Sequence, residues 1–253
     1  MATRDRYGAA RKKKKRSSFF APLSFLLVVV AIVFGMGVFF RVQTIEVHGT
    51  ESYTDEEIIE ASGISIGDNL FFLNSSAASS RIFSRQPLVE SADVRTTLPN
   101  KVTITIEESI PMAYVTWEGQ KWMLTGNCKL LGSAQAADVA GLIQVLNMTP
   151  DSPTAGDMLA VAEGESLKLT YLRELLNAME DLDMVGDVAD LNMENAANPT
   201  FRYLDRFTVR MGNNNNTDYK LRMLMSAVLQ LEPDMTGTMD LSSGGTSVSF
   251  SPD

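Results

Sequence analysis

The sequence predicts an α+β protein in which one helix near the N-terminus spans a membrane and two domains follow it. Residues 19–40 form an apolar run without a charge, long enough to cross a bilayer. Residues 41–109 show short strand patterns around two short helices, and residues 110–253 show further strand patterns interrupted by longer amphipathic helices. We therefore expect a tail (residues 1–18), a transmembrane helix, a small βααββ domain and a larger antiparallel β-domain with packed helices.

The N-terminal tail is strongly basic, whereas the rest of the chain is acidic. Residues 1–18 hold eight of the 22 Lys and Arg residues and one acid, Asp5, so the tail carries +7. Because the net charge of the chain is −9, the remainder carries −16. After Arg41 no Lys or Arg follows until Arg81, which predicts a cytoplasmic N-terminus. The tail could instead contact nucleic acid, but anionic lipid beside it explains the charge better, so we expect contact with the lipid bilayer and no nucleic acid.

The apolar run favours an uncleaved anchor over a signal peptide. A helix over residues 19–40 would be about 33 Å long, which matches a hydrocarbon core of about 30 Å. A signal peptide has an apolar region of about 7–15 residues before a small-residue cleavage site. Residues 35–37 are the only weak candidate for such a site, and the apolar run continues beyond them. We therefore expect a single-pass protein of the cytoplasmic membrane, with residues 41–253 outside the cytoplasm.

The first domain begins with a strand and a short helix. Residues 42–48 alternate apolar and polar side chains, as in a half-buried strand. Thr54 and Glu57 then match a capping box, and Gly63 supplies a helix stop.

A second helix and two strands complete this domain. Asn74 or Ser75 can cap a helix that ends before Pro87. Two strands follow, at residues 92–97 and 102–107, and the apolar side chains of the second strand face one side. The order strand, helix, helix, strand, strand is that of a POTRA domain.

The second domain combines hairpins with amphipathic helices. A turn at residues 118–120 joins two strand patterns, and apolar residues recur at helical spacing over residues 167–182. The asparagine tract at residues 213–216 predicts a turn before a helix over residues 218–234. Residues 238–241 and 247–250 predict a final hairpin. The many methionines could line an adaptable groove, but at helical spacing they are expected in the core, as is Cys128.

One motif raises the possibility of catalysis. Residues 63–67 match G-x-S-x-G, so Ser65 could be the nucleophile of an exported envelope hydrolase. The motif needs a preceding strand and a downstream histidine, whereas a helix is expected before Ser65 and the only histidine, His48, lies upstream. With one histidine and one cysteine, a zinc site is not expected either. We predict no enzyme activity, no cofactor, no metal and no small-molecule substrate.

Several segments in sequence order resemble the FtsQ/DivIB family of bacterial cell division proteins. They are the basic tail and span, "VQTIEVHG", "YTDEEIIEASGI", "GDNLFFLN", "LVESADVRTTLPNKVTITIEES", "PMAYV" and the closing helix and hairpin, together covering residues 11–253. The resemblance implies a non-catalytic division-site scaffold that binds other single-pass membrane proteins, of FtsB/DivIC and FtsL type. A POTRA-type envelope assembly factor is an alternative, but it would be expected to carry tandem POTRA repeats, and one is found.

The final strand is the predicted partner site. Residues 247–250 have one strand neighbour in their own hairpin and carry no charge or proline, so their free edge could accept a partner strand. The alternative is an edge covered by the domain's own helix. The resemblance carries the partner site over to a set of edge positions in the hairpin: Met239, Asp240, Leu241, Val248 and Phe250. It also implies that Lys220 and Arg222 are cations facing acidic groups of the partner.

Overall fold

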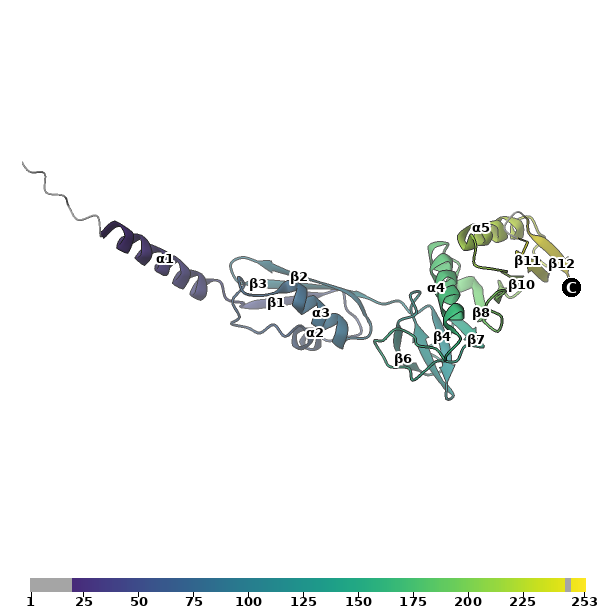
Figure 1. Cartoon of the computed structure of the whole chain (residues 1–253), viewed down its shortest axis with the longest axis horizontal. Coiled ribbons are helices and arrows are strands. Elements are labelled where there is room, and N and C mark those ends of the chain that lie inside the picture. Colours follow the sequence, from purple (N-terminus) through teal and green to yellow (C-terminus); the bar gives the residue numbers. More distant parts are fainter. Residues whose placement is uncertain (1–19, 244–246) are drawn as a thin grey trace, which may run out of the picture.

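The computed structural model describes residues 20–243 and 247–253, and the predicted tail at residues 1–18 lies outside this range. It confirms the α+β class, with an apolar helix followed by a small and a large sheet (Figure 1). Helix α1 (Phe20–Phe39) is long and apolar enough to cross a membrane. Its side chains between Pro22 and Phe39 are not buried against the rest of the protein. The apolar surface of α1 is therefore available to lipid.

The small sheet belongs to a βααββ unit, which we define as β1 to β3. Its helices are capped as the sequence predicts: Thr54 Oγ1 accepts from the amide of Glu57, and Asn74 Oδ1 accepts from the amide of Ala77. The sheet has the order β1-β3-β2, with β1 parallel and β2 antiparallel to β3. Its elements are β1 (Thr44–His48), α2 (Asp55–Ser62), α3 (Ser75–Arg85), β2 (Val89–Thr97) and β3 (Lys101–Glu108).

The rest of the chain forms a large-sheet unit, defined as β4 to β12. Its nine strands have the order β12-β11-β10-β9-β8-β7-β4-β5-β6. The strands are β4 (Ala113–Trp117), β5 (Gln120–Leu124), β6 (Leu130–Ala134), β7 (Ile143–Leu146), β8 (Val188–Asn192), β9 (Thr200–Tyr203), β10 (Phe207–Arg210), β11 (Gly237–Asp240) and β12 (Ser249–Pro252). The helices are α4 (Ser166–Asp181), the short 3₁₀ helix η1 (Val185–Asp187) and α5 (Thr217–Val228).

The large sheet is mixed, which corrects the expectation of an antiparallel one. Strands β7 and β8 are parallel, and so are β10 and β11, and β4 and β7. Parallel neighbours need a crossover connection because the chain must return to the starting end of the sheet. Helix α4 provides this connection between β7 and β8, and α5 provides it between β10 and β11. The two amphipathic helices predicted from the sequence are therefore the crossovers.

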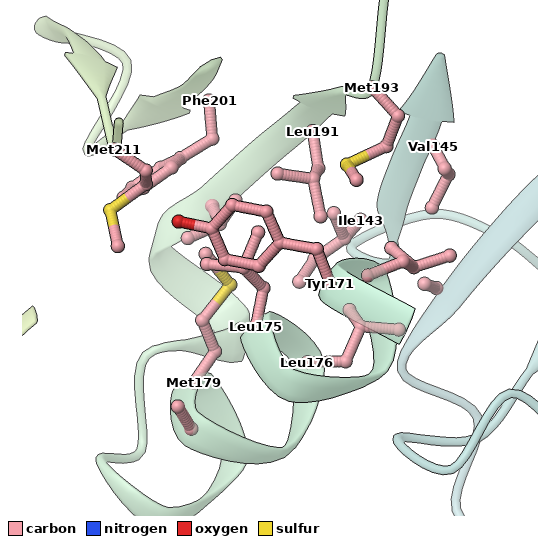
Figure 2. Close-up of a cluster of buried hydrophobic side chains, with 14 of the residues drawn as sticks. Ile143, Val145, Tyr171, Leu175, Leu176, Met179, Leu191, Met193, Phe201 and Met211 are labelled. Carbon is pink, nitrogen blue, oxygen red and sulfur yellow. The ribbon is translucent and has the colours of Figure 1, made fainter. Parts of the chain in front are cut away.

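The core of the large-sheet unit lies between α4 and the sheet (Figure 2). Tyr171 and Leu175 of α4 contribute to it, together with Phe201 of β9. Methionines Met179 and Met211 are fully buried in this cluster, as expected for core residues. Cys128 is also buried, and burial raises the pKa of its thiol to about 11. Burial of this kind makes the thiol a packing residue and a poor nucleophile.

The two units meet at a buried lysine. Lys129 belongs to the large-sheet unit, yet its Nζ donates a 2.6 Å hydrogen bond to the carbonyl of Val89 on β2. The same Nζ lies 4.4 Å from the centre of the Phe83 ring on α3. Lys129 is 4% exposed. The desolvated ammonium group of Lys129 therefore links the βααββ unit to the large-sheet unit.

Candidate partner-binding edge

Strand β12 lies at one edge of the large sheet, at the end of the molecule opposite α1 (Figure 1). It pairs antiparallel with β11 on one side, in the predicted hairpin. On its other side it has no strand partner among the described residues. An unpaired strand edge presents amide and carbonyl groups to which another chain can bind.

The hydrogen-bond pattern shows which backbone groups face outward. The amide of Asp253 donates to the carbonyl of Thr236 at 3.3 Å, so these two residues form a hydrogen-bonded pair. Antiparallel pairs alternate, and therefore Ser251 and Ser249 direct their backbone groups to β11, whereas Phe250 directs its amide and carbonyl outward. Pro252 also lies in the outward register but has no N–H to offer. Within β12 the outward donor is thus the amide of Phe250.

The side chain of Phe250 holds β12 in place. Its half-buried ring packs edge-to-face on Phe207, with 6.1 Å between ring centres, and it is opposite Met239 in the ladder. Gly237 permits this approach, because a Cβ there would lie 2.9 Å from the Phe250 ring and 2.3 Å from the carbonyl oxygen of Ser251. Ser249 and Ser251 are exposed. The side chain of Phe250 therefore faces the core while its backbone faces the open edge.

Three of the predicted edge positions lie elsewhere. Met239, Asp240 and Leu241 are on or next to β11, which is an interior strand between β10 and β12. Met239 and Leu241 are buried, and the carboxylate of Asp240 accepts from the amide of Ser242 at 2.8 Å. Hydrogen bonding from Ser242 lowers the pKa of Asp240. β11 pairs in parallel with β10, a pairing that the sequence did not predict, so these three residues do not lie at the open edge of the sheet.

Val248 lies one residue before β12, half-buried against the core of the large-sheet unit. The strand is therefore shifted toward the C-terminus relative to the predicted residues 247–250. Backbone groups alternate in direction along β12, and Val248 lies two residues before Phe250. If this alternation extends one residue beyond the strand, the amide and carbonyl of Val248 face outward like those of Phe250.

Lys220 does not face a partner, which corrects the expectation for this residue. It is completely buried, and its Nζ donates to the carbonyls of Met211 at 2.9 Å and Asn213 at 2.6 Å. Burial lowers the pKa of Lys220, opposed by the charge of Glu174. Lys220 therefore stabilises the loop between β10 and α5 by hydrogen bonds to its backbone carbonyls.

The exposed face of α5 carries features that the sequence reading missed. Arg222 is exposed, as expected for a partner-facing cation, and it forms a salt bridge with Asp218 at 3.0 Å. Tyr219 and Leu229 are 55% and 87% exposed. The positions 219, 222, 226 and 229 recur at helical spacing and share one face. These positions lie on the side of the helix away from the buried Leu221 and Leu224.

Ser65 lies in a turn after α2 and is exposed. Its amide donates to Asp68 Oδ2 at 2.8 Å, an arrangement that closes a turn. A helix, not a strand, precedes it, so the local geometry differs from a nucleophile elbow. His48 is exposed at the end of β1. The described part of the chain contains no group of three or more His, Cys, Asp or Glu side chains that could hold a metal ion.

Comparisons with known proteins agree with this architecture. The family model "POTRA domain, FtsQ-type" matches residues 40–109. The chain is 26% identical over 194 residues to the cell division protein DivIB of Clostridium tetani, covering 77% of this chain and 72% of that protein. It is 31% identical over 135 residues to DivIB of Bacillus subtilis, covering 53% of this chain and 51% of that protein.

A relative with the other family name shows the same relationship. The cell division protein FtsQ of Syntrophotalea carbinolica is 27% identical over 210 residues, covering 78% of this chain and 69% of that protein. The matched POTRA-type segment spans the βααββ unit. The chain thus carries a POTRA domain of FtsQ type and is similar to the cell division proteins DivIB and FtsQ.

Proposed function

We propose that this chain is a membrane-anchored, non-catalytic scaffold of the bacterial division complex. In this proposal α1 anchors it in the cytoplasmic membrane, its N-terminus stays in the cytoplasm, and its large-sheet unit binds small single-pass division proteins of FtsB/DivIC and FtsL type. Similarity to DivIB and FtsQ supports the division role, because these relatives are named cell division proteins. The free edge of β12 is the observation that supports partner binding.

The proposed binding mode is strand addition. A partner segment would pair with the outward amide and carbonyl of Phe250 and continue along Val248, in the register described above. Pro252 would limit the pairing at the C-terminal end, because it cannot donate a hydrogen bond. Main-chain pairing of this kind supplies affinity, while neighbouring side chains select the partner.

The side chains next to this edge would help to select the partner. The exposed face of α5 presents apolar surface from Tyr219 and Leu229 and one cation, Arg222. An amphipathic partner segment with an acidic group opposite Arg222 would suit this face. Because Arg222 is exposed and already paired with Asp218, we expect it to influence association rate more than complex lifetime.

A matched pair of variants at one position tests the edge. Val248→Pro removes an outward amide donor and keeps three side-chain carbons, whereas Val248→Ala keeps the amide and removes two methyl groups, so it shows how much the side chain alone contributes. With the purified exported segment of an FtsB/DivIC-type protein as ligand, Val248→Pro should reduce affinity at least tenfold and Val248→Ala by less than threefold. Arg222→Glu should slow association by severalfold with little change in dissociation. If Val248→Pro keeps its circular dichroism spectrum and binds as the parent does, the interface is not on this edge.

A reporter fusion tests the proposed topology. The basic flank at residues 1–18 and the absence of Lys and Arg from residues 42–80 support a cytoplasmic N-terminus. An enzyme that is active only outside the cytoplasm, fused after Asp253, should therefore be active. A stable fusion without activity would refute the orientation.

A further inference from the structure

An apolar groove separates the last turns of α1 from the loop that joins α2 to α3. We call residues 66–73 the membrane-proximal loop. The groove has a volume of about 490 Å³, and its walls include Val33, Phe34 and Gly37 of α1 and Asn69, Phe71 and Phe72 of the loop. The apolar residues of the membrane-proximal loop thus lie beside the last turns of α1.

Hydrogen bonds hold this loop against the helix end. Asn69 Nδ2 donates to the carbonyl of Met36 at 3.1 Å, and the amide of Leu70 donates to the carbonyl of Phe40 at 2.9 Å. Carbonyls at the C-terminus of a helix lack intrahelical partners, so the loop satisfies groups that need a donor. The rings of Phe40 and Phe71 also pack edge-to-face at 4.9 Å between centres. The loop is therefore attached to α1 and does not hang from a free linker.

The depth of the contact follows from the position of the first charge. The apolar run ends at Phe40 and is followed by Arg41. At about 1.5 Å per residue, Met36 lies about 6 Å and Val33 about 10 Å further along the helix toward the bilayer centre than Phe40. If Phe40 marks the boundary of the hydrocarbon region, side chains that reach the level of Met36 and Val33 lie within the acyl chains.

The loop presents apolar side chains at this depth. Phe72 is 87% exposed and Phe71 is 48% exposed. On the other side of α1, a second groove of about 600 Å³ brings Pro99 of the β2–β3 turn next to Ile32 and Phe39, and the neighbouring Leu98 is 58% exposed. Scattered exposed apolar residues need no explanation, but a group of them at the membrane end of one unit indicates a contact surface.

We propose that the membrane-proximal loop is a second membrane contact, in which Phe71 and Phe72 enter the acyl chains beside α1 and a phospholipid chain occupies the groove. The proposal rests on the proposed function only in requiring α1 to span a bilayer. The bilayer is the occupant because the groove is continuous with the lipid-facing surface of α1, and Arg41 lies at the level of lipid phosphates. The βααββ unit is then held in one orientation at the membrane surface by two contacts.

Accessibility of nitroxide labels tests this in the full chain reconstituted one molecule per nanodisc. Phe72→Cys reports the loop. Leu229→Cys is the matched control, since Leu229 has the same 87% exposure but lies at the end of α5. Val30→Cys in the middle of α1 is the reference for hydrocarbon. The buried Cys128 should not take the label, and the unsubstituted chain checks this.

Oxygen dissolves in the acyl chains and a nickel chelate stays in water, so their collision ratio reports depth. We expect the ratio at Phe72 to exceed that at Leu229 at least fivefold and to approach that at Val30. A ratio at Phe72 equal to that at Leu229, with Val30 in hydrocarbon, overturns the loop contact and leaves the anchor intact. A label at Phe72 shielded from both reagents would mean that other side chains of this protein, and not a lipid chain, fill the groove, and this also overturns the proposal. An aqueous ratio at Val30 would overturn the anchor itself.

Discussion

Replacing Lys220 with methionine tests whether this lysine stabilises the fold from inside. Methionine has a similar length and a favourable helix propensity, so the change removes the ammonium group with little loss of packing volume. In the structure the ammonium donates to the carbonyls of Met211 and Asn213. The hydroxyl of Tyr171 also donates to the carbonyl of Asn213, at 2.9 Å. The substitution therefore leaves mainly the carbonyl of Met211 without its donor.

The expected cost is about 2 kcal/mol. A buried hydrogen bond to a charged group contributes about 1.5–3 kcal/mol, and an unsatisfied buried acceptor costs about 1–3 kcal/mol. Removing a desolvated charge offsets part of this loss. Arg222→Met is the matched control on the same helix, because its salt bridge with Asp218 is exposed to solvent and contributes little to stability.

Urea unfolding followed by tryptophan fluorescence measures the difference. Both tryptophans, Trp117 and Trp122, lie in β4 and β5, so the signal reports the large-sheet unit. With a urea dependence of about 2 kcal/mol per molar, Lys220→Met should lower the midpoint by about 1 M, and Arg222→Met should lower it much less. Equal shifts of the urea midpoint for the two variants would refute the argument that the buried Lys220 stabilises the fold more than the exposed Arg222.

The pH dependence of the same variant gives an independent check. Burial lowers the pKa of Lys220 in the folded protein relative to its unfolded value. Between the two pKa values the unfolded chain binds more protons, so this group makes stability rise with pH in that window. In Lys220→Met that rise should disappear. A slope unchanged from the parent would mean that the ammonium is not desolvated.

Three further predictions concern other parts of the chain. In β3, Ile104 is buried and Thr103 is on the opposite face, so Ile104→Ala should cost about 2–5 kcal/mol and Thr103→Ala less than about 1 kcal/mol, measured by hydrogen exchange of the βααββ unit. Partial burial acts to raise the pKa of Glu108, but hydrogen bonds from Thr50, Ser52 and Glu51 outweigh burial, so the pKa is lowered. The resulting stabilisation is present above the unfolded pKa and is lost as the pH falls through the folded pKa. The NMR signal of the Ser52 amide should therefore shift over that pH window in the parent and not in Glu108→Gln. Because the thiol of Cys128 is buried and its pKa is raised to about 11, a maleimide should label it in urea and leave it unmodified in the folded protein at pH 7.5.

Local signals in the sequence predicted local structure well. The capping box at Thr54 and Glu57 forms as expected because both partners lie within one helical turn. The side-chain phase of β3 is confirmed by the burial of Val102, Ile104 and Ile106, which share one face of a strand. Features of this kind depend on neighbours in the sequence and need no knowledge of the tertiary fold.

Features that depend on distant segments were predicted less well. The pairing of β10 with β11 is parallel and encloses β11 on both sides, and no local pattern near Met239 reveals this. The positions of Thr217, Lys220, Leu221 and Leu224 do follow a buried helical stripe, but the family resemblance implied a partner-facing Lys220. The lysine is tolerated inside because the carbonyls of the β10–α5 loop converge on its ammonium group, an arrangement that only the folded chain provides.

The placement of the free strand edge at the end opposite α1 has a consequence for reach (Figure 1). In the proposed topology, a partner anchored in the same bilayer would reach β12 only if its own exported segment extended past the whole βααββ unit. The buried hydrogen bond from Lys129 to Val89 links the two units in the middle of this length. A partner with a short exported segment would be excluded by geometry alone, before any side chain is compared. Shortening a partner's stalk by whole helical turns should therefore abolish assembly abruptly, while leaving the affinity of its isolated binding segment unchanged.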